Sequence, residues 1–177
     1  MHAEETGGGS MEQGLELVQK AKAGNVEAFS LLYQEVYRDL YRFALYTLKN
    51  IHDAEDVVSD TVADAWKGVR GLRRAESFKA WIFRILANKC RRRLRQYMDK
   101  TVELPLDLAE DSRDICRDMD VRRAFAELSD EERMILAMNI FGGYTSREIG
   151  KALHMSSNTV RSKQSRALKK MEACLER

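Results

Sequence analysis

The sequence predicts an all-α fold of two small helical domains joined by a flexible acidic linker. The chain has 177 residues and a single proline, whereas proteins built from short strands usually carry frequent proline and glycine turns. Hydrophobic residues recur three or four positions apart over most of the chain, which is the period of an amphipathic helix. The acidic stretch 99–120 breaks this period and contains the proline. These observations divide the chain into a disordered segment at 1–10, a domain at 11–98, the linker at 99–120 and a second domain at 121–177.

The first domain is expected to contain four amphipathic helices. Their hydrophobic residues share one side, and polar residues that can cap a helix stand close to their starts. The four are expected at 14–23, ending before Gly24; at 25–48; after His52, with Asp53 as cap, to about Val69; and at 78–96, after the cap Ser77.

The second domain has the order of a helix-turn-helix motif. Two capping boxes, in which a Ser or Thr is followed three residues later by Glu, predict two helix starts. The boxes are Ser129 with Glu132 and Thr145 with Glu148, the glycines 142–143 end one helix, a short turn follows at 154–156, and the last helix covers 157–175.

Three residues of this motif constrain its packing. Gly150 permits a close approach between the helices, and His154 stands where such motifs usually place glycine, at some conformational cost. Gln164 lies in the apolar side of the last helix, so it either finds a partner or leaves loose packing. The residues of that helix expected to pack on its neighbours are Val160, Ala167, Leu168 and Met171.

Composition excludes several classes of protein. Three cysteines, far apart, are poor material for a disulfide framework and fit a reducing cytoplasm. With the three histidines they form no pair at metal-ligand spacing. No hydrophobic run reaches the roughly 18 residues of a membrane span, and no catalytic arrangement or phosphate-binding loop is recognisable. We expect no enzymatic activity, cofactor, metal, small-molecule substrate or membrane insertion.

The outer side of the last helix suits duplex DNA. It carries short hydrogen-bonding groups for base edges, flanked by arginines for phosphates. A basic helix can also be merely solvated, but the capping boxes, Gly150 and the turn length favour DNA binding. The residues are Asn158, Ser162, Ser165 and Lys169, with Arg161 and Arg166 beside them.

Residues 78–96, FKAWIFRILANKCRRRLRQ, contain no acidic residue although the net charge of the chain is only +2. One side of this helix carries Arg84, Asn88, Arg91, Arg92 and Arg95, with Trp81 at its edge, which suits single-stranded nucleic acid. Trp81 fits the core at least as well, and Asn88 can simply face solvent.

The preceding helix has the opposite character. Its start, DAEDVVSDTVADAW, holds five acidic residues and no basic one. The helix dipole stabilises acidic groups in the first turn only. Asp56, Asp60 and Asp64, four apart, repel one another along one face. A basic protein partner would account for them.

Taken together, DAEDVVSDTVADAW, ESFKAWIFRILANKCRRRLR and LSDEERMILAMNIFGGYTSREIGKALHMSSNTVRSKQSRALKKM resemble regions 2 and 4 of an extracytoplasmic-function (group IV) sigma factor of the sigma-70 family. The resemblance covers about residues 15 to 175. It implies a bacterial initiation factor that binds core RNA polymerase and promoter DNA, melts the promoter, and is restrained by an anti-sigma factor. It also implies that the chain is cytoplasmic and that an anti-sigma factor can hold it near the membrane.

The resemblance implies three sets of site residues. Polymerase docking falls on Asp53, Asp56, Val57, Asp60 and Trp66. Binding of the −10 element falls on Arg73 and Arg74 of the loop 72–77 and on Trp81, Arg84, Asn88, Arg91, Arg92 and Arg95. Binding of the −35 element falls on Asn158, Thr159, Arg161, Ser162, Lys163, Ser165, Arg166 and Lys169.

Two residues depart from the family pattern, and two other functions remain open. Arg92 stands where many members have aspartate, and Gln164 where leucine or isoleucine is usual. A stand-alone helix-turn-helix regulator would combine the second domain with an N-terminal helical sensing domain, and it would leave the acidic stripe and the arginine side without a role. A helical adaptor would use neither basic side for nucleic acid.

Overall fold

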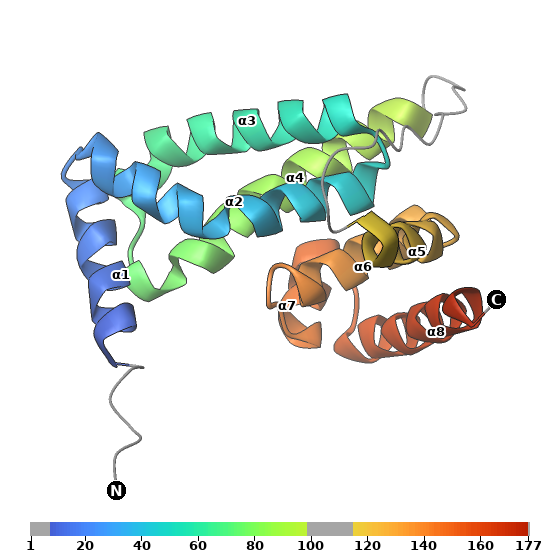
Figure 1. Cartoon of the computed structure of the whole chain (residues 1–177). Coiled ribbons are helices and arrows are strands. Elements are labelled where there is room, and N and C mark those ends of the chain that lie inside the picture. Colours follow the sequence, from blue (N-terminus) through green and yellow to red (C-terminus); the bar gives the residue numbers. More distant parts are fainter. Residues whose placement is uncertain (1–7, 99–114, 177) are drawn as a thin grey trace, which may run out of the picture.

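The computed structural model describes residues 8–98 and 115–176, with side chains from 12 to 97 and from 120 to 176. Within these ranges the chain is helical and contains no strand. The first domain consists of α1 (Gly8–Lys22), α2 (Val26–Leu48), α3 (Ile51–Gly68), two short 3₁₀ turns η1 (Val69–Gly71) and η2 (Ala75–Ser77), and α4 (Phe78–Met98). The second consists of α5 (Ile115–Ala126), α6 (Asp130–Ile140), α7 (Ser146–Leu153) and α8 (Ser157–Leu175) (Figure 1).

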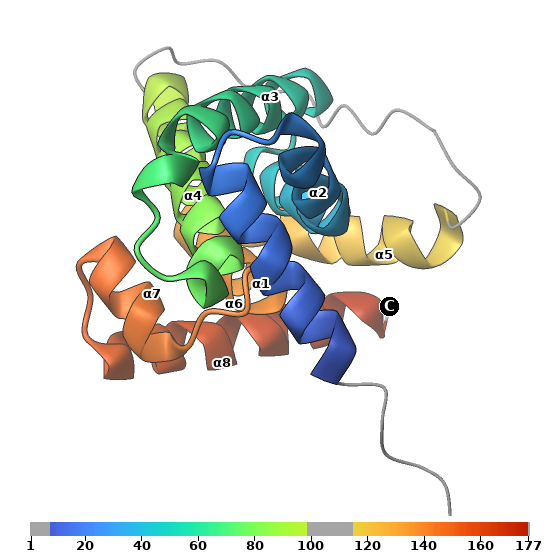
Figure 2. The ribbon, with the colours of Figure 1, turned by 90° about the vertical axis from the view of Figure 1, so that its left-hand side faces the viewer.

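In the first domain, α2, α3 and α4 lie alongside one another and α1 crosses one end of them (Figures 1 and 2). The apolar side of α2 forms the centre, where Leu40 and Phe43 are fully buried. From α4, Ile82, Phe83 and Leu86 are equally buried. Removing this much apolar surface from water is the main favourable term for folding. The predicted inward sides of both helices are thereby confirmed.

Of the two caps predicted in the first domain, the one at Asp53 is wrong. The N-cap of α3 is Asn50, whose side chain accepts from the backbone N–H of Asp53 at 2.9 Å, so the cap lies three residues earlier than predicted. Ser77 ends η2 and its hydroxyl donates to the carbonyl of Arg74 at 2.7 Å. A hydroxyl that donates can also accept, and Ser77 directly precedes α4, so its role as the cap of this helix stays a prediction.

In the second domain both capping boxes are confirmed, at Ser129 for α6 and at Thr145 for α7. His154 is in the left-handed region, with φ 59°, as the turn requires. A Cβ on Gly150 would lie 2.6 Å from the carbonyl oxygen of Met155 in the turn and 3.5 Å from the nitrogen of Ser157, the first residue of α8, so the predicted close approach is present. Gln164 accepts a hydrogen bond from Ser146 at 2.9 Å and therefore has a partner in α7.

One residue of α8 lies differently from the prediction. Val160 and Ala167 are fully buried and Met171 nearly so, but the side chain of Leu168 is exposed. At about 100° per residue, Leu168 lies roughly 80° around the helix from Val160, at the margin of the stripe that the other three share.

The two domains pack against each other. One continuous hydrophobic core contains Phe43 and Leu86 of the first domain together with Met138 and Ile149 of the second. Figure 2 shows α5 and α6 below α2 and α4, and α6 contacts both of these helices whereas α5 contacts α2. The sequence predicted the two domains but not this contact.

The described segments also bear on the predicted boundaries. The first helix begins at Gly8, inside the segment predicted to be disordered, and α5 begins at Ile115, inside the predicted linker. Residues 1–7 and 99–114 lie outside the described part of the chain. Among the helices described, none combines the length and hydrophobicity needed to cross a bilayer.

Candidate nucleic-acid interface

The acidic residues of α3 differ in whether α4 holds them closely. Asp53 is mostly buried and accepts from Arg93 of α4 at 3.1 Å and from the Tyr97 hydroxyl. Asp64 pairs with Lys89 at 2.7 Å, and this neighbour lowers the pKa of the Asp64 carboxyl. Asp53 and Asp64 therefore tie α3 to α4.

Asp56 and Asp60 are exposed and lack a close ion pair with α4. The Asp56 side chain is 69% exposed and 3.9 Å from Arg93, and Asp60 is also exposed. Within the described residues Asp60 forms no ion pair. Two carboxylates on neighbouring turns of one helix remain accessible to a cationic partner.

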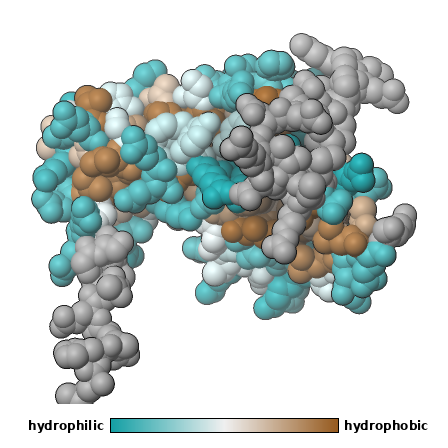
Figure 3. Space-filling view, in the orientation of Figure 1, coloured by the Kyte–Doolittle hydropathy of each residue, from teal (hydrophilic) through white to brown (hydrophobic). Residues whose placement is uncertain are grey.

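A groove lies beside these carboxylates, between α2 and α3. It has a volume of about 670 Å³, and the half-buried Trp66 lines it. The Trp66 ring packs edge-on against Phe29, with centroids 5.2 Å apart. Figure 3 shows hydrophobic surface at the left, where α2 begins and α3 ends in Figure 1. Val57, by contrast, is buried in the core and offers no contact surface in this conformation.

Sequence reasoning missed the other wall of this groove. Tyr33, Tyr37 and Tyr41 are spaced four apart along α2, and their rings contact in series at 5.5 and 6.2 Å. The spacing was a readable signal, because residues four apart share one side of a helix. The three tyrosines lie at the edge of the apolar side of α2, so their spacing was not distinguished from that of the core residues.

On α4 the arginine side is largely exposed. Arg84, Asn88, Arg92 and Arg95 are on the surface. Arg91 is partly buried because its guanidinium donates to the carbonyl of Ala152 in α7 at 2.9 Å.

Trp81 combines the two expectations for it. It is half-buried, with its ring 6.0 Å from that of Phe78 and close above Gly68, yet one side of it lines an open cleft. Arg73 and Arg74 of the preceding loop are exposed, and Arg74 lies 3.7 Å from Glu76.

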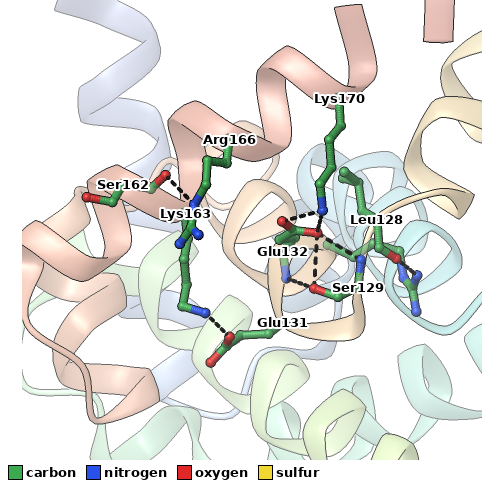
Figure 4. Close-up of polar contacts among 9 residues, drawn as sticks. Leu128, Ser129, Glu131, Glu132, Ser162, Lys163, Arg166 and Lys170 are labelled. Carbon is green, nitrogen blue, oxygen red and sulfur yellow. Dashed lines mark hydrogen bonds and ion pairs between the residues drawn. The ribbon is translucent and has the colours of Figure 1, made fainter. Parts of the chain in front are cut away.

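On α8 most of the predicted residues face outwards. The exposed ones are Asn158, Thr159, Arg161, Ser162, Ser165, Arg166 and Lys169. Lys163 is the exception, because its ammonium turns inwards and pairs with Glu131 of α6 (Figure 4). Beside it, Lys170 pairs with Glu132 at 2.8 Å and lowers the pKa of that carboxyl. These two lysines hold α8 on α6.

Metal and thiol chemistry find no support in the described ranges. No group of three or more His, Cys, Asp or Glu side chains there could hold a metal ion. Cys90 is fully buried, and burial raises the pKa of its thiol, which keeps it protonated and inert.

Comparison with known families adds the decisive observation. Residues 32–98 match sigma-70 region 2, and residues 118–171 match sigma-70 region 4. Together the matches cover about two thirds of the chain, in the expected order. The chain belongs to the extracytoplasmic-function group of the sigma-70 family. It is an RNA polymerase sigma factor. The hypotheses of a stand-alone regulator and of a helical adaptor are therefore excluded.

Relatives agree over most of the length. The RNA polymerase sigma factor SigV of Bacillus subtilis is 29% identical over 140 residues, covering 76% of this chain and 82% of SigV. The sigma factor SigM of Mycobacterium tuberculosis is 27% identical over 164 residues, covering 91% of this chain and 84% of SigM.

Solved structures show the same fold. The sigma factor RpoE of Bartonella quintana, in complex with the anti-sigma factor NepR, is similar with a TM-score of 0.70 and 24% identity, over 85% of this chain and 98% of RpoE. CnrH in complex with the cytosolic domain of CnrY has a TM-score of 0.65 and 24% identity, over 93% of this chain and 97% of CnrH.

Proposed function

We propose that this sigma factor docks on core RNA polymerase through the outward face of α3, formed by Asp56, Asp60 and the adjoining aromatic groove. The groove offers apolar contact and the two carboxylates offer charge. A helix that is apolar on one side and basic beside it fits this combination. Asp53 and Val57 act from within, holding α3 in place.

The observation that carries the proposal is the separation of charge by helix. Carboxylates face outwards on α3, while arginines face outwards on α4 and on α8. In a chain with a net charge of only +2, each face attracts a different partner.

We assign the −10 element to α4 and the loop before it. Opened DNA presents phosphates and unstacked bases, which arginines and an aromatic edge bind. Arg84, Arg92 and Arg95 supply charge, the Asn88 amide can hydrogen-bond a base, and Trp81 offers a partly exposed ring. Arg73 and Arg74 extend the cationic surface along the loop.

We assign the −35 element to α8. Its Ser162, Ser165 and Asn158 side chains are of a size to reach base edges in the major groove, and Arg166 and Lys169 lie beside them for phosphates. Lys163, which is held by Glu131, contributes by positioning α8 in this conformation.

The role so assigned is binding rather than catalysis. We further propose an anti-sigma factor as a partner, because the similar RpoE was solved bound to one. Such a partner would hold the chain near the membrane if it is itself a membrane protein.

The docking face is tested by the double variant Asp56→Lys/Asp60→Lys. Each reversal replaces attraction by repulsion, at about 1 kcal/mol per exposed position, so affinity for core polymerase should fall roughly 30-fold at low salt. The matched control, Glu12→Lys/Glu35→Lys, makes the same charge change at exposed positions of α1 and α2. Fluorescence anisotropy of labelled chain against core polymerase measures both. Equal affinities for the two variants would refute docking through α3.

A further inference from the structure

One arginine in the basic run 91–93 of α4 has no part in the proposed DNA face. Arg92 is exposed, and Arg91 donates to the carbonyl of Ala152 at 2.9 Å. Arg93 instead reaches towards α3, and its side chain is only 30% exposed. This cation therefore acts on the helix that carries the docking carboxylates.

Asp53 holds the Arg93 guanidinium in place. Nη1 of Arg93 lies 3.1 Å from Oδ1 of Asp53, whose side chain is 17% exposed. The Tyr97 hydroxyl donates to Oδ2 of the same carboxylate. A charged hydrogen bond with limited access to water is stronger than one on the open surface. Arg93 is thus tethered beside α3 by a residue that a partner cannot easily reach.

The tethered guanidinium also lies next to Asp56. Its Nη2 is 3.9 Å from Oδ2 of Asp56, which is close enough for Coulomb attraction but too long for a hydrogen bond. The positive charge of Arg93 therefore offsets part of the negative potential at Asp56, and it repels any cation that approaches this carboxylate. Asp60 has no such neighbour among the ion pairs of the described residues.

We propose that Arg93 is a built-in antagonist of polymerase docking. It keeps the affinity of α3 for a basic partner below the level that Asp56 and Asp60 alone would give. It also contributes specificity, because a like charge penalises a partner that places its cation beside Asp56 more than one that uses Asp60. This inference rests on the proposed docking face.

A purely structural Arg93 would have the opposite effect on docking. If its ion pair with Asp53 served only to hold α3 on α4, removing the pair would loosen the docking face and weaken the binding of polymerase. The two roles therefore predict changes of opposite sign in affinity for the same substitution. A loss of stability does not separate them, because both roles include the pair with Asp53.

Arg93→Gln tests the sign. At ~0.1 M salt it should tighten the binding of the full chain to core RNA polymerase roughly threefold, which is the scale of one exposed charge pair. Arg93→Lys keeps the charge and should lose most of this gain. Fluorescence anisotropy of the labelled chain measures the affinities.

The matched control is Lys79→Gln. It removes the same charge from the same helix and breaks a surface ion pair with Asp39 of 3.1 Å. Lys79 lies 14 residues before Arg93, or roughly 21 Å along the helix, which is about twice the screening length of ~10 Å at this salt concentration. Lys79→Gln should therefore leave the affinity for polymerase nearly unchanged.

The outcomes separate this inference from the docking proposal. If circular dichroism shows that Arg93→Gln loses helix, Arg93→Met replaces it, since an unbranched side chain keeps the packing of the arginine stem without the charge. With the fold intact, weaker binding, or binding equal to that of Lys79→Gln, would overturn the antagonist role while a loss of affinity in Asp56→Lys/Asp60→Lys would leave the docking face standing. If that double variant binds like its own control, the docking face is wrong and the role of Arg93 falls with it.

Discussion

Replacing Gly150 by alanine should destabilise the helix-turn-helix motif. The added Cβ would lie 2.6 Å from the Met155 carbonyl oxygen and 3.5 Å from the Ser157 nitrogen, and real Cβ atoms essentially never come within 3.0 Å of another heavy atom. The turn cannot easily give way, because the Gly150 carbonyl accepts from the backbone N–H groups of His154 and of Met155, the latter at 2.8 Å.

The net effect follows from two opposing terms. Overpacking costs about 1–3 kcal/mol, and alanine in place of glycine returns up to about 1 kcal/mol of helix propensity. Gly150→Ala should therefore lower the free energy of unfolding by about 1–2 kcal/mol. Urea denaturation followed by circular dichroism measures it.

The matched control is Gly14→Ala in α1, where a Cβ meets nothing within 4 Å. It should stabilise the chain by about 0.5–1 kcal/mol through propensity alone. If Gly150→Ala proved as stable as Gly14→Ala, the close approach at the turn would be absent in solution, and the reasoning from it would be wrong.

Three further outcomes are expected. Thr145→Ala removes the acceptor for the Glu148 backbone N–H and should lower the free energy of unfolding, measured by thermal denaturation, by about 1 kcal/mol. Thr145→Ser keeps a hydroxyl acceptor and should retain most of this stabilisation. The Thr145 N–H and hydroxyl lower the pKa of the Glu148 carboxyl. The contribution of Glu148 to the free energy of unfolding is therefore complete above the unfolded pKa of about 4.3 and is lost as pH falls through the folded pKa. Glu148→Gln should reduce the change of the urea midpoint over this acid range, and an unchanged pH profile would contradict the cap. Arg166→Gln should reduce the salt slope of duplex binding by about 1, while Lys22→Gln in α1 should not, and equal slopes would remove Arg166 from the DNA face.

Local signals predicted the helices well because their causes are local. A capping box such as that of Ser129 lies within four residues, and an apolar period needs only the helix itself. The errors came where neighbours compete. At the start of α3, Asn50 takes the capping role predicted for Asp53.

The contact between the domains left no such signal. Arg91 and Arg133 both donate to main-chain carbonyls, which every residue carries, so no complementary side chain marks their partners in the sequence. Arg91 also lies on the side of α4 whose arginines predict nucleic-acid binding. The sequence around Arg91 looks the same whether its guanidinium binds a phosphate or the carbonyls at a helix end, and only the folded structure shows which partner it has.

One hydrogen bond between the two domains does not depend on pH in the neutral range. Burial raises the pKa of Tyr144 to about 12, so its hydroxyl stays protonated and keeps donating to the carbonyl of Ala80. The contact that this bond supports should therefore be the same on either side of neutral pH.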